Sequence, residues 1–220
     1  MAVIHRRHDL LDYLVSLGAD PKAFQQAPLL SMAVADRNVD MAERLLFYGD
    51  DVDWIDERNR SYLLQAILNE DEDIAALLIK HGIDGDWTVE AYNQHVYHAV
   101  RLGATWIVPY CLSKGASLQY EVRGRPMLSH AVDSDNPAIV RLLLDLGADV
   151  NWHSDTEPSI LSRAIHRMKL DIAFALFNAG AVLKINEVAV SLARTAYFSK
   201  ALFQELIQQG ALINAQDSMG

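Results

Sequence analysis

The stretch RPMLSHAVDSDNPAIVRLLLDLGADVN, residues 125–151, decides the fold. Its apolar residues recur with helical spacing on both sides of Asn136 and Pro137. Asn136 is suited to cap a second helix, because its side chain can accept a hydrogen bond from an unpaired amide, and proline suits the first helical turn. Gly147 then ends that helix in the left-handed conformation that a residue without a β-carbon adopts at little cost. The stretch therefore predicts two helices joined by a short turn.

The same pattern recurs along the whole chain. Seven glycines follow one another at intervals of 31, 33, 33, 32, 33 and 30 residues, namely Gly18, Gly49, Gly82, Gly115, Gly147, Gly180 and Gly210. An apolar pair stands three and four residues before each of them. A small residue stands sixteen residues before the first six, namely Ala2, Ala33, Ala66, Ala99, Ala131 and Ala164. A period of this length predicts a solenoid of stacked helical hairpins.

Apolar and polar residues alternate behind the glycines. Three and four residues past the glycine stand pairs such as Val52 and Asp53, or Val150 and Asn151. A period of two predicts a short, half-buried strand. We expect this strand to form one arm of a finger-like hairpin that joins consecutive repeats.

This pattern resembles the ankyrin repeat, a β-turn followed by two antiparallel helices over about 33 residues, with the signature T-P-L-H-x-A. The fifth copy is the most similar, with Pro126-Met127-Leu128-Ser129-His130-Ala131, then Leu143-Leu144 and Gly147-Ala148-Asp149-Val150-Asn151. The resemblance covers the whole chain. It implies an all-α fold, a helical solenoid with short β-hairpin or turn fingers between the helix pairs.

Other residues replace the signature histidine of the family, namely Ser31, Leu64, Tyr97, Ser129 and Ser162. The resemblance implies that this histidine braces the turn, so we expect the repeats to be less stable than consensus ones. Residues 1–220 are predicted to form a single array. Ala2 aligns with the middle of a first helix, and residues 216–220 read like the turn into another repeat. We therefore expect a segment of a longer array, with a natural start at Met1 and a truncated cap as the alternative.

Composition limits the partners and the compartment. The chain has 29 acidic and 19 basic residues, a net charge of −10, and no stripe of Lys and Arg. Nucleic acid and anionic membranes are therefore poor partner candidates. No apolar run approaches the ~20 residues that cross a bilayer, and the amino terminus lacks the apolar core of a signal peptide. The single cysteine, Cys111, occupies a core position, which fits a reducing compartment. We expect an intracellular protein, cytoplasmic or nuclear, that is not secreted.

An aromatic residue stands five residues after four successive glycines, and these residues are Trp54, Trp87, Tyr120 and Trp152. Stacked repeats would align them as a ladder. Aromatic ridges are favoured anchors at protein interfaces, which suggests a binding role. Packing against neighbouring fingers is the other interpretation, and a partly buried ring can serve both.

The resemblance implies two contact surfaces. One consists of fingertip residues, which are rich in acid: Asp53, Asp56, Glu57, Asp86, Glu90, Glu121, Asp155 and Glu157. The other is the concave face of the first helices, which should present Asp36, Asn69, Arg101, Asp133, Ser134, His166 and Arg167. A basic or mixed-charge protein is the expected partner of the fingertips, although acidic side chains there also serve simply as a solvated surface.

No motif indicates catalysis or a cofactor. The chain has no glycine-rich phosphate loop, no G-x-S-x-G elbow and no H-E-x-x-H helix. Two histidine pairs with a spacing of three, His5 with His8 and His95 with His98, fall short of the three or four ligands of a stable zinc site. We therefore expect a protein-interaction module that is no enzyme and needs no small-molecule substrate. The alternative is a regulatory domain that docks on an enzyme or signalling domain of the same, longer chain.

Overall fold

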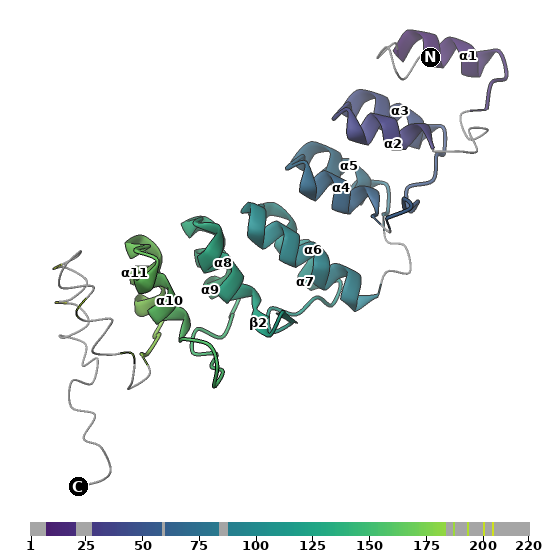
Figure 1. The fold of residues 1–220 in the computed structure, drawn as a ribbon. Helices are drawn as coiled ribbons and strands as arrows, with labels where there is room; N and C mark the ends of the chain where they lie inside the picture. Colours follow the sequence, from purple (N-terminus) through teal and green to yellow (C-terminus); the bar gives the residue numbers. More distant parts are fainter. Residues whose placement is uncertain are drawn as a thin grey trace, which may run out of the picture. The chain divides into compact units, whose positions relative to one another are not determined.

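A computed structural model describes residues 8–20, 28–58, 60–83 and 88–183, together with the single residues Glu187, Ala193, Lys200 and Gln204. Asp86, Trp87 and Gly210 lie outside these described residues. The chain divides into two compact units, residues 1–102 and 103–220. Both units are built from short helices, as Figure 1 shows, so the predicted all-α class is confirmed. The single array over residues 1–220 stays a prediction.

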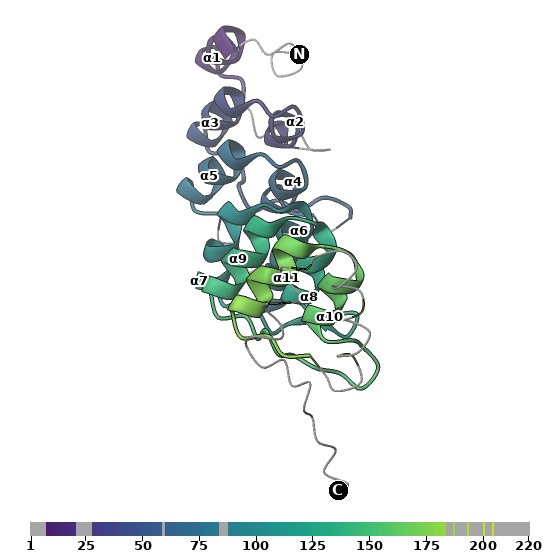
Figure 2. The same ribbon diagram turned by 90° about the vertical axis from the view of Figure 1, so that its left-hand side faces the viewer.

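The first unit stacks helical hairpins. Its helices are α1 (His8–Ser16), α2 (Leu29–Ala35), α3 (Val39–Phe47), α4 (Tyr62–Leu68), α5 (Glu72–Lys80) and α6 (Val89–Leu102). Helix α2 packs on α3 and α4 packs on α5, which completes two hairpins. Between hairpins, α2 packs on α4 and α3 on α5, so first and second helices form separate rows, visible side by side in Figure 2.

The second unit repeats this arrangement. It contains the 3₁₀ turn η2 (Thr105–Ile107), α7 (Val108–Ser113), β1 (Glu121–Val122), β2 (Arg125–Pro126), α8 (Met127–Ser134), α9 (Pro137–Asp145), α10 (Ile160–His166) and α11 (Leu170–Asn178). The hairpins are α8 with α9 and α10 with α11, and they meet through α8 with α10 and α9 with α11. No helix within the described ranges is both long enough and apolar enough to cross a membrane.

The recurring small residue lies where hairpins meet. Five of the six predicted alanines are described, and all five are at most 1% exposed: Ala33, Ala66, Ala99, Ala131 and Ala164. The apolar residue three positions earlier is equally buried in each of these repeats, as Leu30, Leu63, Val96, Leu128 and Leu161. A larger side chain at the alanine position would push the helices apart, because packed helix axes lie only about 8–10 Å apart.

The predicted helix caps are confirmed. Asn38 Oδ1 accepts the Met41 amide at 3.2 Å, and Asn136 Oδ1 accepts the Ala138 amide at 2.9 Å. Six of the seven recurring glycines are described, and all have a left-handed φ between 80° and 98°. A second left-handed position, twelve residues before the glycine, joins the two helices of each hairpin. It is occupied by Arg37, Glu70, Gly103, Asp135 and Met168.

The prediction of a strand directly after each recurring glycine is wrong. Residues 52–53, 118–119 and 150–151 form turns. The residue two positions past the glycine folds them, because its side chain accepts a backbone amide: Asp51 from Asp53 at 3.0 Å, and Asp149 from Asn151 at 2.9 Å. Such local acceptors compete with strand pairing. The predicted alternation is nevertheless present in the burial of Val52–Asp56, where half-buried and exposed residues alternate.

A true hairpin forms further along one finger. Strands β1 and β2 pair antiparallel, with Val122 opposite Arg125. The two residues between them, Arg123 and Gly124, have φ values of 54° and 69°. Two left-handed residues are typical of the type I′ turn, whose twist matches that of the paired strands.

Candidate functional site

The finger between α3 and α4 carries four of the predicted contact residues. Asp53 and Glu57 are exposed, whereas Trp54 is half-buried. The Trp54 ring stacks on Tyr62 of α4, with centroids 5.5 Å apart and an interplanar angle of 29°. Tyr62 is fully buried, and burial raises the pKa of its hydroxyl. Packing is therefore one role of Trp54, since it attaches the finger to the first helix behind it.

Asp56 closes the same finger. Its carboxylate accepts the amides of Arg58 at 2.9 Å and Arg60 at 2.8 Å, and the Arg60 Nε–H at 2.7 Å. Partial desolvation opposes ionisation, but these donors outweigh it and lower the pKa of Asp56. With only 14% of its side chain exposed, Asp56 has an internal role in loop closure. Its contact with a partner stays a prediction.

The fingers of the second unit enclose an open depression of about 580 Å³. Four predicted contact residues line it, namely Glu121, Trp152, Asp155 and Glu157, together with Arg123. Trp152 donates its indole N–H to Glu121 Oε1 at 2.9 Å, which connects two consecutive fingers. This hydrogen bond orients the half-buried Trp152 ring at the edge of the depression.

Asn151 connects this finger to the next one. Its side-chain amide donates to the Gly180 carbonyl at 3.0 Å, and its carbonyl accepts the Val182 amide at 2.9 Å. One side chain thereby satisfies a donor and an acceptor of the neighbouring backbone. The described fingers of the second unit are therefore linked by side chains as well as by the helices behind them.

On the first-helix face of the second unit, charged residues form a cluster. Asp133 of α8 lies among three arginines, with Arg125 Nη1 at 2.8 Å, Arg167 Nε at 3.1 Å and Arg163 Nη1 at 4.0 Å. Arg163 also pairs with Glu157 of the finger depression. The structure thus brings Asp133 and Arg167 together, and Glu157 makes their cluster continuous with the finger surface.

Several other predicted residues belong to neither group as defined above. Glu90, expected at a fingertip, lies in the first turn of α6. His166 is exposed at the end of α10, and Tyr120 is half-buried just before β1. Arg101 belongs to the first unit, where its guanidinium lies 5.7 Å from the Tyr97 ring centroid. His130, adjacent to the substituted signature position, donates from Nε2 to the Val122 carbonyl at 2.9 Å and so braces the β1–β2 hairpin. Burial lowers the pKa of His130, which favours the neutral ring.

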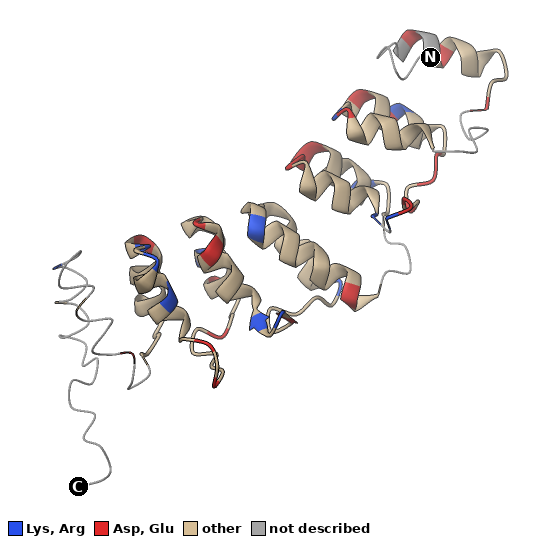
Figure 3. Cartoon of the chain, viewed as in Figure 1, with Lys and Arg blue, Asp and Glu red and all other residues tan. Residues whose placement is uncertain are grey.

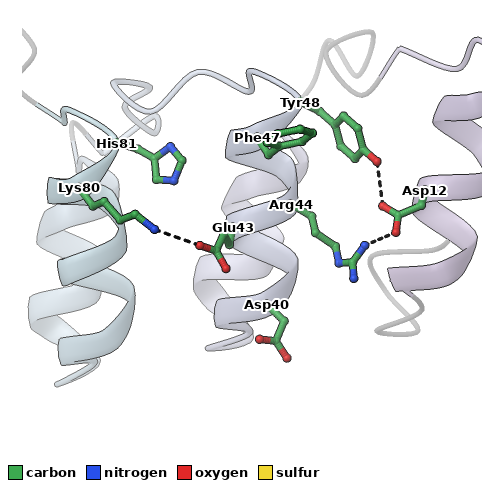
Figure 4. Close-up of a pocket in the computed structure, with 8 residues that line it drawn as sticks. All are labelled: Asp12, Asp40, Glu43, Arg44, Phe47, Tyr48, Lys80 and His81. Atoms are coloured by element: carbon green, nitrogen blue, oxygen red, sulfur yellow. Dashed lines mark hydrogen bonds and ion pairs between the residues drawn. The ribbon is translucent and has the colours of Figure 1, made fainter.

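A second surface, which the sequence analysis missed, lies along the second helices of the first unit. Figure 4 shows Asp12 with Arg44 and Tyr48, and Glu43 with Lys80, around an open pocket of about 720 Å³. The hydrogen bond from Tyr48 to Asp12, 2.9 Å long, raises the pKa of the tyrosine hydroxyl.

Phe47 stands out in this pocket because it is 80% exposed. Two residues before the closing glycine, the other described repeats carry Ser16, Lys80, Ser113, Asp145 and Asn178. An exposed aromatic residue at a position that is otherwise polar was the signal available in the sequence.

The two units differ in how charge is distributed, as Figure 3 shows. The loop between α3 and α4 is mainly acidic, with Asp50, Asp51, Asp53, Asp56 and Glu57 against Arg58 and Arg60. In the second unit, Arg125, Arg163 and Arg167 lie beside Asp133 and Glu157. Cys111 is fully buried, as predicted, and burial raises the pKa of its thiol to about 12. Within the described ranges, no three His, Cys, Asp or Glu side chains are grouped so that they could hold a metal ion.

Family models of ankyrin repeats match residues 1–87, 30–122 and 123–152 of the chain. The chain is similar to three solved ankyrin repeat domains. The human ASB11 domain is 22% identical, with 83% of each chain covered and a TM-score of 0.64. The domain of Bcl-3, a member of the IkappaB family, is 24% identical, with 83% of this chain and 86% of that one covered and a TM-score of 0.63. A domain from Acinetobacter baumannii AYE is 23% identical, with 82% and 96% covered and a TM-score of 0.65. No curated protein sequence matches the chain.

Proposed function

This chain belongs to the ankyrin repeat family, and from that premise we propose that it is a protein-interaction module whose fingers and first-helix face hold a protein partner. Ankyrin repeat domains are generally modules of this kind. The observation that supports this surface is the finger depression of the second unit, which continues through Glu157 into the Asp133 cluster. No catalytic role and no cofactor are part of the proposal.

The ordering of the contact residues supports the proposal energetically. Trp152 is held by Glu121, Trp54 by Tyr62 and Arg167 by Asp133. Side chains that are ordered before binding lose less conformational entropy when a partner arrives, and an immobilised long side chain otherwise costs about 0.5–1.5 kcal/mol. A half-buried tryptophan at the edge of a depression is also the residue type most often found at the energetic centre of interfaces.

Charge suggests the chemistry of the partner at the fingers. The exposed fingertip residues Asp53, Glu57 and Asp155 are acidic, whereas Arg123 is exposed beside the second-unit depression. We infer that the fingers receive a basic or mixed-charge surface. The buried, unpaired Cys111 fits a reducing compartment, so an intracellular location is part of the proposal.

The experiment is affinity capture from a lysate of the source cell, with bound proteins identified by mass spectrometry. The variant Asp155→Lys changes an exposed charge at the edge of the depression. The control Asp145→Lys makes the same charge change on the exposed side of α9, outside the fingers. We expect a partner to bind wild type and the control but not Asp155→Lys. Equal capture by both variants, each with a native circular dichroism spectrum, would show that the fingers of the second unit do not carry the interaction.

A further inference from the structure

The arginines around Asp133 offer more donors than their neighbours accept. Three guanidinium groups carry fifteen N–H donors in all, whereas the two carboxylates of Asp133 and Glu157 offer about eight acceptor sites. Arg167 Nε lies 3.1 Å from Asp133 Oδ1, but that oxygen has no partner with hydrogen-bond geometry. The contact is therefore an ion pair without a directed hydrogen bond, and Arg167 keeps donors for another acceptor.

Burial makes the unmatched donors costly. Only 12% of the Arg163 side chain is exposed, and its Nε is buried with no acceptor among the residues that the structure describes. A buried donor without an acceptor is destabilising, because it has lost its hydrogen bonds to water. Arg167, in contrast, is 47% exposed, so its guanidinium is reachable from solvent. Arg163 is therefore a buried arginine with an unsatisfied donor, and Arg167 is an arginine that solvent can reach.

The positive charge is local and unlike the rest of the chain. The cluster of Arg125, Arg163, Arg167, Asp133 and Glu157 has an excess of one positive charge, in a protein whose net charge is −10. In the two hairpins of the first unit, the position equivalent to Arg163 is occupied by Met32 and Gln65. The position equivalent to Arg167 is occupied by Asp36 and Asn69. The repeat pattern does not require arginine there.

We propose that this face of the second unit binds an acidic segment of the partner protein, through a carboxylate of Asp or Glu held by Arg167. The inference rests on the proposed function and adds the chemistry of the partner at this face. Arg163 lies on α10, and Arg167 is the C-cap residue of that helix, four residues later. Arg167 is the accessible group and can meet the carboxylate as a two-pronged guanidinium–carboxylate pair. Arg163 is nearly buried and pairs with Glu157, so it adds positive charge behind this site.

A carboxylate suits the cluster better than a phosphate. Asp133 already lies among the three arginines, and its charge repels a dianion more strongly than a single negative charge. The excess of one positive charge matches one carboxylate at a time. Phosphate groups instead favour arginine clusters without a resident acid, because their charge near neutral pH is −1.5 to −2.

The test measures binding of the full chain to a short fluorescein-labelled peptide in which glutamate alternates with serine. Binding is measured by fluorescence anisotropy, first at low salt and then at increasing salt concentrations. A second peptide has glutamine in place of glutamate. A third peptide has glutamine in place of glutamate and phosphoserine in place of serine. Arg167→Gln removes the accessible arginine. Arg141→Gln makes the same charge change on the exposed side of α9 and is the matched control. Asp133→Asn keeps the shape of the cluster but removes its resident charge.

We expect the glutamate peptide to bind wild type and to bind Arg167→Gln about tenfold more weakly, with Arg141→Gln within about twofold of wild type. Asp133→Asn should bind more tightly than wild type, a gain that structural damage would not produce. Equal losses in the two arginine variants, no binding of the glutamate peptide at low salt, or binding of the phosphoserine peptide alone would overturn the inference. The affinity-capture experiment is independent of this test, because Asp155→Lys leaves α8 and α10 unchanged. If Asp155→Lys loses the partner but the glutamate peptide does not bind, only this inference is rejected. If the glutamate peptide binds but Asp155→Lys still captures the partner, only the finger surface is rejected.

Discussion

Trp152 donates its indole N–H to Glu121 across 2.9 Å, and thereby connects two fingers whose residues are 31 positions apart in the chain. Glu121 therefore holds Trp152, a residue of the proposed contact surface, in place as well as contributing negative charge. Replacing it with lysine would remove an acceptor and a charge together, so the two effects must be separated. Glutamine does this, because its side-chain carbonyl accepts the same hydrogen bond without the charge.

Glu121→Ala should release the Trp152 ring, whereas Glu121→Gln should retain its orientation. The measurement is the indole ¹H–¹⁵N resonance of Trp152, assigned by its disappearance in Trp152→Phe. We expect an upfield shift of the indole proton in Glu121→Ala and a much smaller change in Glu121→Gln. Indistinguishable shifts in the two variants would contradict the hydrogen bond as the orienting contact.

Met168→Gly should stabilise the protein. Met168 has a φ of 63° between α10 and α11, and a residue with a β-carbon pays about 1–2 kcal/mol in that conformation. The greater freedom of glycine in the unfolded chain offsets part of this gain, so we expect about 0.5–1 kcal/mol in urea unfolding. Met168→Ala is the control, since it removes the same side chain but keeps the β-carbon. A midpoint that rises equally in both would assign the gain to the lost side chain.

Gly103→Ala should have the opposite effect. Gly103 occupies the equivalent left-handed position with a φ of 78°, and an added β-carbon would collide with the side-chain amide of Asn136. That side chain caps α9, so moving it sacrifices the cap. We expect a loss of about 2 kcal/mol, combining backbone strain with the cap. In Asn136→Ala the collision is removed, and the added cost of Gly103→Ala should fall, which a double-mutant cycle measures.

Stability should fall as pH is lowered from 7 to 5 because of His95. Burial, followed by the charge of His98, lowers the pKa of His95 from 6.5 to about 4. The unfolded chain therefore binds a proton between these values that the folded state does not, and stability decreases as pH falls through this window. One such group contributes about 2 kcal/mol between pH 7 and pH 5.

His95→Gln isolates this contribution, since glutamine does not titrate and the other histidines remain. The free energy of unfolding in urea, measured at several pH values, should depend less steeply on pH in the variant. Parallel curves for wild type and His95→Gln would mean that His95 titrates normally in the folded protein.

Asn151→Ala should loosen the link between consecutive fingers. The variant loses the hydrogen bonds to the Gly180 carbonyl and the Val182 amide. Because the site is exposed, we expect a loss of only about 1 kcal/mol in urea unfolding. Asn178→Ala removes the same side chain from the exposed end of α11 and should change stability by less than about 0.5 kcal/mol. Equal losses would show that the link is energetically neutral.

The helical hairpins could be predicted because their determinants are local and recur. Ala66 and Ala131, for example, stand sixteen residues before a glycine, and both are completely buried. The strand behind the glycine was predicted wrongly, because alternation alone does not distinguish a strand from a turn with the same alternating burial. The acceptors that fold it, Asp51 and Asp149, were visible in the sequence at a fixed position after the glycine.

The spacing of glycines, alanines and apolar pairs was sufficient to establish the repeat, the helices and the buried positions, since each depends on contacts with residues nearby in the chain or at one repeat length. The contacts of the side chains in the candidate site depended on packing. Glu121 meets Trp152, and Asp133 meets Arg167, only because one hairpin lies on the next in a particular register. Which side chains face one another across that interface is set by the fit of whole helices and fingers, and the linear order of residues does not contain it.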